Sequence, residues 1–331
     1  MNETLAILSR LVDPQTFPAR LATLVKVDGS SYRRTGARLL LDATGARVGS
    51  ISGGCLEEDL LARMRRLNAS RPEDVVTYDT TSENDLLWGV GTGCHGVVVV
   101  VLEYLPAPPA WAQTALARLQ RRQPTAVTVT WGSPGGGTRL AAGRPRDAEE
   151  ASAGFHQDLL PPHRLVICGA GDDARALVRL AKGLGWTVCL IDPRAELVRP
   201  ERWPEADETH ALPADEVPMA LQWDDSTAAV IMTHHYRHDL PLLAALLPLK
   251  LSYLGLLGPR LRADRLLADL PAGVRAAAAE TPARLSAPVG LDLGGDGPEA
   301  VALSILAEIQ ARFAGRSARP LRQRDRGIHD R

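Results

Sequence analysis

The sequence predicts an α/β protein of two domains, an N-terminal mixed α+β domain followed by a Rossmann-like domain with a doubly wound parallel sheet. The chain has 331 residues, 45% of them hydrophobic, and this length suits two domains that each bury a core. Short β-rich runs alternate with turns from residue 20, and the pattern changes to strand, helix, strand from residue 164. Paired prolines, Pro161 and Pro162, disfavour both helix and central strand, so we expect domains of residues 1–160 and 161–331.

The first domain contains several short apolar runs that predict strands. The runs LATLVKV and ARLLLD come first, and the turn DATG at residues 42–45 predicts a hairpin between ARLLLD and ARVGSISGG. Residues 56–67 place apolar side chains at helical spacing. VVTYD and GVVVVVLEYL predict two further strands, a helix is expected near residues 111–122, and AVTVTWG with TRLAAG predicts a second hairpin.

The second domain opens with a β-α-β unit. RLVICGAG, DDARALVRLAKGLG and WTVCLIDPR predict two parallel strands joined by a helix, and such a crossover is right-handed. AAVIMTHH and KLSYLGLLG predict later strands, and the alanine-rich segment near residues 299–313 predicts a closing helix. Residues 315–331 are rich in arginine, so we expect a solvated basic C-terminal tail.

Charge and composition exclude several classes of protein. The 38 Lys and Arg against 39 Asp and Glu leave a formal charge of −1, which excludes a disordered chain and a nucleic-acid binder that works through bulk charge. The longest valine run, residues 97–101, is too short to cross a bilayer, so we expect a cytoplasmic protein without a membrane span. The four cysteines are scattered without a C-x-x-C pair, which indicates thiols rather than a zinc knuckle or a disulfide framework.

A glycine-rich segment follows the first strand of the second domain. Its G-x-G-x-x-A pattern contains Gly169 and Gly171 and opens a helix, and Asp192 ends the next strand. In this context the glycines let backbone approach a phosphate, the helix N-terminus supplies N–H donors, and the acidic residue accepts from a ribose hydroxyl. Asp172 and Asp173 in the first helical turn repel a pyrophosphate, so a nucleotide ligand and a sheet edge with another role both stay open.

Two cysteines of the first domain follow glycines. Gly53 and Gly54 precede Cys55 at the expected start of a helix, and Gly93 precedes Cys94 at the start of the valine strand. A helix N-terminus favours a thiolate, and thiolates are soft donors suited to a sulfur-bearing metal centre. A cysteine is commonly a small buried hydrophobe, but the flanking glycines favour a ligand site here.

A histidine-rich segment follows the strand AAVIM. His234 and His238 have the spacing that places two side chains on one helix face, Asp239 comes next, and strand ends are where an α/β sheet exposes its crevice. A metal site of these three residues is therefore one hypothesis, although no Glu stands between the histidines as in H-E-x-x-H.

Two further charged residues lie beside glycine turns. Arg34 lies in a basic turn and either holds a phosphate or lies on the surface. Asp292 precedes the last helix and is either a cap or a carboxylate in the crevice. Their spacing alone leaves both alternatives open.

These segments together resemble a known family. GSSYRRTGARLLL, GSISGGCLEEDL and VTYDTTSENDLLWGVGTGCHGVV are similar to the N-terminal domain of the XdhC/CoxI family, the xanthine dehydrogenase accessory proteins. CGAGDDARALVRLAKGLGWTVCLIDPR, MTHHYRHDL, YLGLLGPR and APVGLDLGGDGPEAVALSILAEI are similar to its Rossmann domain. The resemblance runs from about residue 23 to residue 309. His235 replaces an acidic position of the family's T-H-D-H run, and Asp172 stands where the family often has a neutral residue.

The resemblance implies an accessory protein rather than an enzyme. Such a protein binds molybdenum cofactor, as molybdopterin or its dinucleotide form, and protects it. It also supports exchange of an oxo for a sulfido ligand by a cysteine desulfurase, and delivers the cofactor to a molybdenum hydroxylase of the xanthine dehydrogenase type. We expect Cys55 and Cys94 to face the molybdenum or its sulfur, and a homodimer is expected. The expected cofactor-binding residues are Cys55, Cys94, Gly53, Gly54, Gly93, Gly169, Gly171, Asp192, Arg34 and Asp292.

Three other functions remain open from the residues alone. The β-α-β unit is compatible with an NAD(P)-dependent oxidoreductase, although the chain offers no convincing Tyr-x-x-x-Lys pair. His234, His238 and Asp239 are compatible with a metal-dependent hydrolase. An adaptor that binds a partner protein through its arginine-rich tail is the third.

Overall fold

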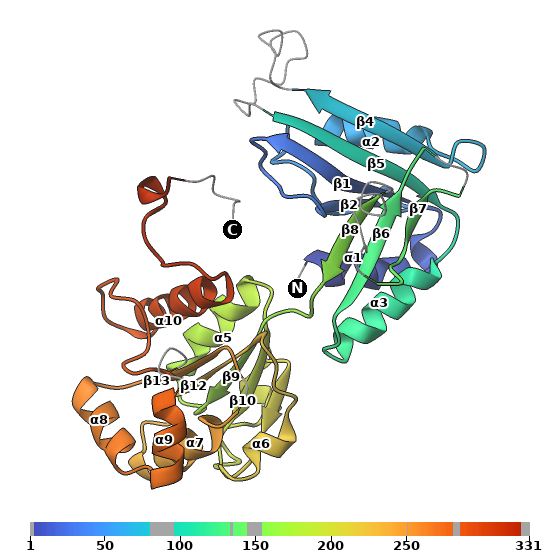
Figure 1. The fold of residues 1–331 in the computed structure, drawn as a ribbon. Coiled ribbons are helices and arrows are strands. Elements are labelled where there is room, and N and C mark those ends of the chain that lie inside the picture. The colour runs from blue at the N-terminus through green and yellow to red at the C-terminus, as the bar shows by residue number, and fades with distance from the viewer. Residues whose placement is uncertain are drawn as a thin grey trace. The chain divides into compact units, whose positions relative to one another are not determined.

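The structure is a computed structural model that describes residues 3–79, 96–132, 135–143, 154–249, 251–280 and 285–325. The chain folds as two compact units, residues 2–161 and residues 162–331 (Figure 1). Among the helices of the described residues, none is both long enough and apolar enough to cross a membrane.

A five-stranded antiparallel sheet forms the centre of the first unit, in the order β3-β2-β1-β5-β4. The turn between β2 and β3 closes because the side chain of Asp42 accepts from the backbone N–H groups of Thr44 and Ala46, and Gly45 takes a φ of +86°. The expected hairpin is therefore present. The strands are β1 (Ala19–Gly29), β2 (Arg38–Leu41), β3 (Arg47–Gly49), β4 (Glu73–Asp79) and β5 (Gly96–Leu105).

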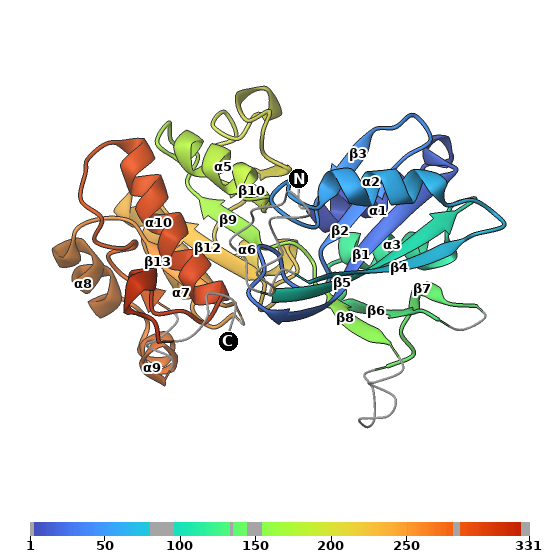
Figure 2. The same cartoon turned by 90° about the horizontal axis from the view of Figure 1, so that it is seen from above.

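Both faces of this sheet are covered. Helix α2 (Glu57–Arg66) covers one side, as Figure 2 shows. Its buried residues Leu60, Leu61 and Met64 belong to the core on that side. The other side packs on α1 (Glu3–Val12) and α3 (Ala110–Gln120). A second sheet, in the order β7-β6-β8, completes the unit; its strands are β6 (Thr125–Thr130), β7 (Gly137–Leu140) and β8 (Phe155–Leu159). A 3-10 turn, η1 (Pro14–Thr16), links α1 to β1.

The second unit contains a six-stranded parallel sheet in the order β11-β10-β9-β12-β13-β14. The chain runs outward from β9 through β10 to β11 and then returns to β12 on the other side of β9. The switch point of a doubly wound sheet therefore lies between β9 and β12. The strands are β9 (Arg164–Cys168), β10 (Thr187–Ile191), β11 (Glu208–His210), β12 (Thr227–Ile231), β13 (Tyr253–Leu256) and β14 (Leu285–Ser286).

Helices lie on both faces of this sheet (Figure 1), and alternate residues of the strands belong to the two cores. On one face Leu165 and Ile167 of β9 pack against α5 (Ala174–Gly183) and α10 (Pro298–Phe313). On the other, Val166 and Cys168 pack against the remaining helices. Those helices are α6 (Val217–Ala220), α7 (Tyr236–Leu246), α8 (Arg260–Ala268) and α9 (Ala272–Glu280), and the unit also has short 3-10 turns, η3 (Pro200–Arg202) and η5 (Leu321–Gln323). A mixed α/β chain with a Rossmann-like second domain is thus confirmed.

Candidate functional site

Gly169 brings the loop after β9 onto the end of β12. Its φ is +128°, and a Cβ at this position would lie 2.5 Å from the carbonyl carbon and oxygen of Met232. No side chain fits there without moving backbone, since real Cβ atoms do not approach so closely. In this structure the glycine serves contact between two strand-end loops.

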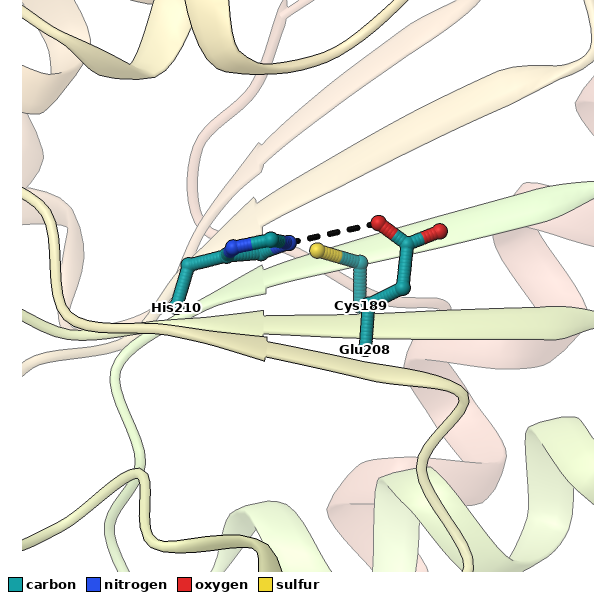
Figure 3. Close-up of side chains that lie close together, drawn as sticks. All are labelled: Cys189, Glu208 and His210. Atoms are coloured by element: carbon teal, nitrogen blue, oxygen red, sulfur yellow. Dashed lines mark hydrogen bonds and ion pairs between the residues drawn. The ribbon is translucent and has the colours of Figure 1, made fainter.

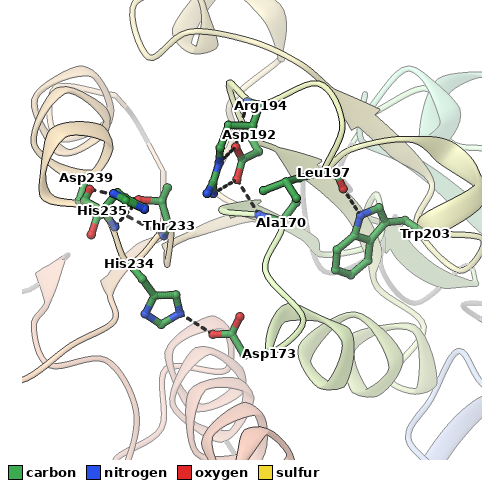
Figure 4. Close-up of polar contacts among 10 residues, drawn as sticks. All are labelled: Ala170, Asp173, Asp192, Arg194, Leu197, Trp203, Thr233, His234, His235 and Asp239. Atoms are coloured by element: carbon green, nitrogen blue, oxygen red, sulfur yellow. Dashed lines mark hydrogen bonds and ion pairs between the residues drawn. The ribbon is translucent and has the colours of Figure 1, made fainter.

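Asp192, at the end of β10, is fully buried and binds the same loop (Figure 4). Its carboxylate accepts from the Ala170 N–H at 3.0 Å and from the Arg194 N–H at 3.0 Å. The Arg194 side chain donates twice more, from Nε at 2.8 Å and from Nη2 at 2.7 Å. These four donors fill the lone-pair positions of a carboxylate. The ribose contact expected at Asp192 therefore has no free acceptor here.

The pKa of Asp192 follows from these contacts. Burial alone opposes ionisation, but the hydrogen bonds from Arg194 and from the backbone of Ala170 outweigh it and hold the pKa of the carboxyl below its ordinary value. Asp192 is therefore a buried anion that joins the β9–α5 and β10 loops.

Asp173 and His234 meet across the switch point between β9 and β12 (Figure 4). The imidazole Nε2 of His234 lies 2.7 Å from Oδ2 of Asp173, and the His234 side chain is 53% exposed. His234 has a φ of +61°, a left-handed conformation that is uncommon for residues other than glycine. A carboxylate thus stands where a Rossmann fold usually presents helix N–H groups to a phosphate.

The expected metal set of His234, His238 and Asp239 is not assembled. Helix α7 begins at Tyr236, so His234 precedes the helix and does not share a face with His238, which corrects that expectation. Asp239 is fully buried, accepts from the Thr233 hydroxyl at 2.5 Å, and receives Arg262 Nη2 at 2.5 Å. Its carboxylate fixes the β12–α7 loop.

A groove lies beside the carboxyl ends of β10 and β11, and His238 belongs to its lining. Its volume is about 820 Å³, and its walls are mostly apolar and rich in proline. The lining residues are Ile191, Pro193, Leu212, Pro213, Ala214, Asp215, Pro218, Arg237, His238, Pro241, Leu242, Ala244 and Ala245. Sequence reasoning missed this groove because its walls come from three separate segments.

Cys55 lies on an exposed turn just before α2 in the first unit. Of the three cysteines that the structure describes, Cys55 is exposed, whereas Cys168 and Cys189 are buried. Gly54 takes a φ of +118°, which L side chains rarely adopt, and Gly53 is exposed beside it. The turn therefore presents an exposed thiol directly after two glycines.

Glu57, at the start of α2, holds the Cys55 turn in place through hydrogen bonds to the residues before it. It is buried, and Oε1 accepts from the backbone N–H groups of Ile51 at 3.2 Å and Ser52 at 2.7 Å. The Ser52 hydroxyl donates to the other carboxylate oxygen and accepts from the N–H of Leu56 at 3.1 Å. Burial opposes ionisation, yet these hydrogen bonds keep the pKa of Glu57 below its ordinary value. Sequence reasoning missed Glu57, although an acidic residue at a helix start is a recognisable signal.

The remaining expected residues are distributed over both units. Gly93 and Cys94 lie outside the described residues. Arg34 is exposed on the loop after β1. Gly171 lies in the loop before α5, and Asp292 is exposed in the loop before α10. The structure therefore gathers Gly169, Gly171 and Asp192 at one sheet edge, while Cys55 and Arg34 belong to the other unit.

Another set of side chains does come together. Cys189, Glu208 and His210 place a sulfur, a carboxylate oxygen and a ring nitrogen within 4.8 Å of one another (Figure 3). Within the described parts of the chain it is the one group of three or more such side chains. Sequence reasoning missed it because the cysteine lies on β10 and its two partners on β11.

Comparison with known proteins adds the family. A model of the XdhC Rossmann domain matches residues 165–309, and a model of the XdhC and CoxI family matches residues 15–79. A Bacillus subtilis protein described as a probable xanthine dehydrogenase subunit is 31% identical over 328 residues, covering 92% of this chain and 95% of the relative. The chain belongs to the XdhC/CoxI family. This membership confirms the resemblance carried by the sequence motifs.

Two further proteins are similar to this chain and carry different descriptions. The molybdenum cofactor insertion chaperone PaoD of Escherichia coli is 26% identical over 293 residues, covering 88% of this chain and 82% of the relative. A crystal structure described as a xanthine dehydrogenase from Bacillus halodurans matches with a TM-score of 0.78 and 30% identity, covering 97% of this chain and 98% of that one. This chain and that crystal structure therefore share a fold along nearly their whole lengths.

Proposed function

We propose that this protein is a molybdenum cofactor-binding accessory protein. It holds and protects the cofactor, supports its sulfuration by a cysteine desulfurase, and delivers it to a molybdenum hydroxylase of the xanthine dehydrogenase type. Support comes from family membership and from similarity to a cofactor insertion chaperone over 88% of the chain. Molybdenum cofactor is the cargo of this protein, and the proposal concerns binding and transfer rather than turnover.

The observation that carries the proposal is the exposed Cys55 thiol on a fixed turn. Molybdenum with its dithiolene and sulfido ligands is a centre to which a soft thiolate is a suitable donor. The turn is held in place by Glu57 and Ser52, so the thiol is positioned before a ligand arrives. Cys168, in contrast, is fully buried, and burial raises the pKa of its thiol far above the ordinary value.

The groove beside β10 and β11 is a separate candidate ligand site, which lies entirely within the second unit. It is apolar and proline-lined, which suits a flat heterocycle, and it lies at the carboxyl edge where doubly wound sheets bind ligands. Arg237, in its lining, supplies a cation for a phosphate. A flat heterocycle with a phosphate, such as a pterin or a nucleotide base, is the class of ligand that this lining suits.

Transfer to an apo-hydroxylase tests the proposal. Cofactor-loaded protein is mixed with cofactor-free hydroxylase, and the recovered hydroxylase activity is compared with that given by free cofactor exposed to air. We expect the wild type and Cys168→Ala to restore activity efficiently, and Cys55→Ala to restore it at least several-fold less. If Cys55→Ala restored as much hydroxylase activity as the wild type, the role of the thiol would be refuted. If the loaded wild-type protein restored no more activity than free cofactor, the delivery function would be refuted.

NAD(P) binding is the second candidate, and the groove is the observation that favours it. The groove lies where a Rossmann fold accommodates an adenine ring. Asp192 disfavours NAD(P) binding, because its acceptor positions are filled by Ala170 and Arg194 and leave none for a ribose hydroxyl. Titration with NADH, monitored by nicotinamide fluorescence, separates the two: saturable binding would favour the oxidoreductase, and none is expected.

A further inference from the structure

Cys189, Glu208 and His210 lie on one face of two neighbouring strands. Cys189 and Glu208 are register partners in the parallel pair β10·β11, and His210 follows Glu208 by two residues, so all three side chains project to the same side. The His210 Nε2 lies 3.2 Å from the Glu208 Oε2, and Figure 3 shows the Cys189 sulfur pointing between the two groups. The arrangement is thus set by β register rather than by a flexible loop.

The separations suit a small tetrahedral site. A zinc ion with ligands at about 2.0–2.3 Å places those ligand atoms about 3.4–3.6 Å apart. The three candidate atoms already lie within 4.8 Å of one another. Closing that difference requires rotation of the Glu208 and His210 side chains, which are both partly exposed.

The donor types select the class of ion. A thiolate, an imidazole and a single carboxylate suit borderline-soft Zn²⁺, whereas Mg²⁺ and Ca²⁺ prefer sites built of oxygen. Arg164 Nη2 lies 3.2 Å from the Glu208 Oε1 and lowers the affinity of the site for every cation, so binding depends on the thiolate and imidazole bonds that Zn²⁺ favours. The same contact orients Glu208 and leaves Oε2 toward the ring of His210.

Access to the cluster is from the side of β11. Cys189 is 1% exposed and forms the buried end, whereas the side chains of Glu208 and His210 are 39% and 35% exposed. Three protein ligands with one side open to solvent leave room for water at a fourth position. His210 is the register partner of Ile191, which lines the groove, so the cluster adjoins that groove.

We infer that Cys189, Glu208 and His210 form a binding site for one Zn²⁺ ion, with a water molecule or an incoming ligand in the fourth position. The inference goes beyond the proposed function, because neither the Cys55 turn nor cofactor binding enters it. On binding, the Cys189 thiol releases its proton to solvent and its sulfur bonds to the ion, so the site has no redox step.

Metal titration of the full-length protein tests the site. Protein treated with chelator is titrated with Zn²⁺ against a competing indicator, and Co²⁺ substitution reports thiolate ligation through its sulfur-to-metal absorption band. We expect one Zn²⁺ per chain in addition to any ion held by Cys55, a tetrahedral Co²⁺ spectrum, and no measurable affinity for Mg²⁺. Absence of such a Zn²⁺ site in the wild type would overturn the inference.

Matched variants assign the ligands. Cys189→Ala and His210→Gln should each weaken Zn²⁺ binding more than tenfold, and Cys189→Ala should abolish the sulfur band. Cys168→Ala removes a buried thiol from the adjacent strand β9 and should change neither the Zn²⁺ affinity nor the sulfur band of the Co²⁺ form. Cys55→Ala should likewise keep the Zn²⁺ site on β10 and β11. Circular dichroism confirms folding. If Cys189→Ala fails to fold, His210→Gln alone tests the site, because His210 is only partly buried. Unchanged Zn²⁺ affinity of the His210→Gln protein would contradict the site.

Discussion

Asp192 shows why a motif residue has to be read with its neighbours. Its place at the end of the second Rossmann strand could be predicted from the sequence, and so could the glycine pattern before α5. Its partners could not be predicted, because an arginine two residues further on can equally point to solvent. In the structure Arg194 folds back and supplies three of the four hydrogen bonds to the carboxylate.

The stability contribution of Asp192 should depend on pH. Its folded-state pKa lies below the ordinary value of 3.8, so the stabilisation is fully present above that value and is lost as the pH falls through the folded-state pKa. At pH 7 we expect Asp192→Asn to lower the free energy of unfolding by about 1–3 kcal/mol, because it leaves Arg194 and backbone donors poorly paired. Urea unfolding between pH 7 and pH 3 measures the gap between the two proteins. The difference in the free energy of unfolding between wild type and Asp192→Asn should become smaller below about pH 4. A difference that does not change with pH would contradict the ionised state of Asp192 in the folded protein.

Gly169 offers a residue-scale test of the contact between strand ends. Gly169→Ala should destabilise the protein by about 2 kcal/mol or more, because the new Cβ meets the Met232 carbonyl group and φ is positive. Gly183→Ala is the matched control, since it lies in α5 with nothing within 4 Å of its Cβ. The control should be neutral or stabilising by up to about 1 kcal/mol. Thermal unfolding measures both, and similar midpoints for the two variants would contradict the close approach.

At the scale of elements, long periodic segments and strands joined by a recognisable turn were predictable, whereas the short edge strand β11 was not. The helix expected over residues 56–67 is α2, Glu57–Arg66, and the expected strand VVTYD lies within β4. The three-residue strand β11 has too few residues to show a period, yet it supplies two members of the zinc site. The expected helix face shared by His234 and His238 was wrong because α7 starts two residues after His234.

The turn that carries Cys55 should depend on Glu57. Glu57→Gln replaces an ionised acceptor by an amide, so at pH 7 we expect a loss of about 1–3 kcal/mol in the free energy of unfolding and weaker cofactor retention, although Cys55 is unchanged. Glu58→Gln, at the exposed neighbouring position, should change stability by less than about 0.5 kcal/mol. Chemical denaturation and the cofactor content of the two variants check this. Equal effects would show that Glu57 has no special part in the turn.

For the whole molecule, the family and the fold class could be predicted because motifs from both halves occur in order along the chain. Each unit has its own hydrophobic core: Leu39 and Met64 are buried in the first, and Leu177 and Leu243 in the second. Contacts across strands, such as those of Cys189 with β11, could not be predicted, because they depend on strand order rather than on sequence spacing. The expected thiol pair of Cys55 and Cys94 stays a prediction, since Cys94 lies outside the described residues.

The most direct measurement is the molybdenum and pterin content of the purified full-length protein, produced in cells that make the cofactor. Molybdenum is counted by elemental analysis and pterin by fluorescence after oxidation, on the same sample. For the wild type we predict molybdenum and pterin in equal amounts, near one of each per chain. In Cys55→Ala we predict at least a several-fold loss of both. The zinc bound by Cys189, Glu208 and His210 should stay in that variant. Wild-type protein that carries neither molybdenum nor pterin, and acquires neither when incubated with free cofactor, would contradict the function proposed for this chain.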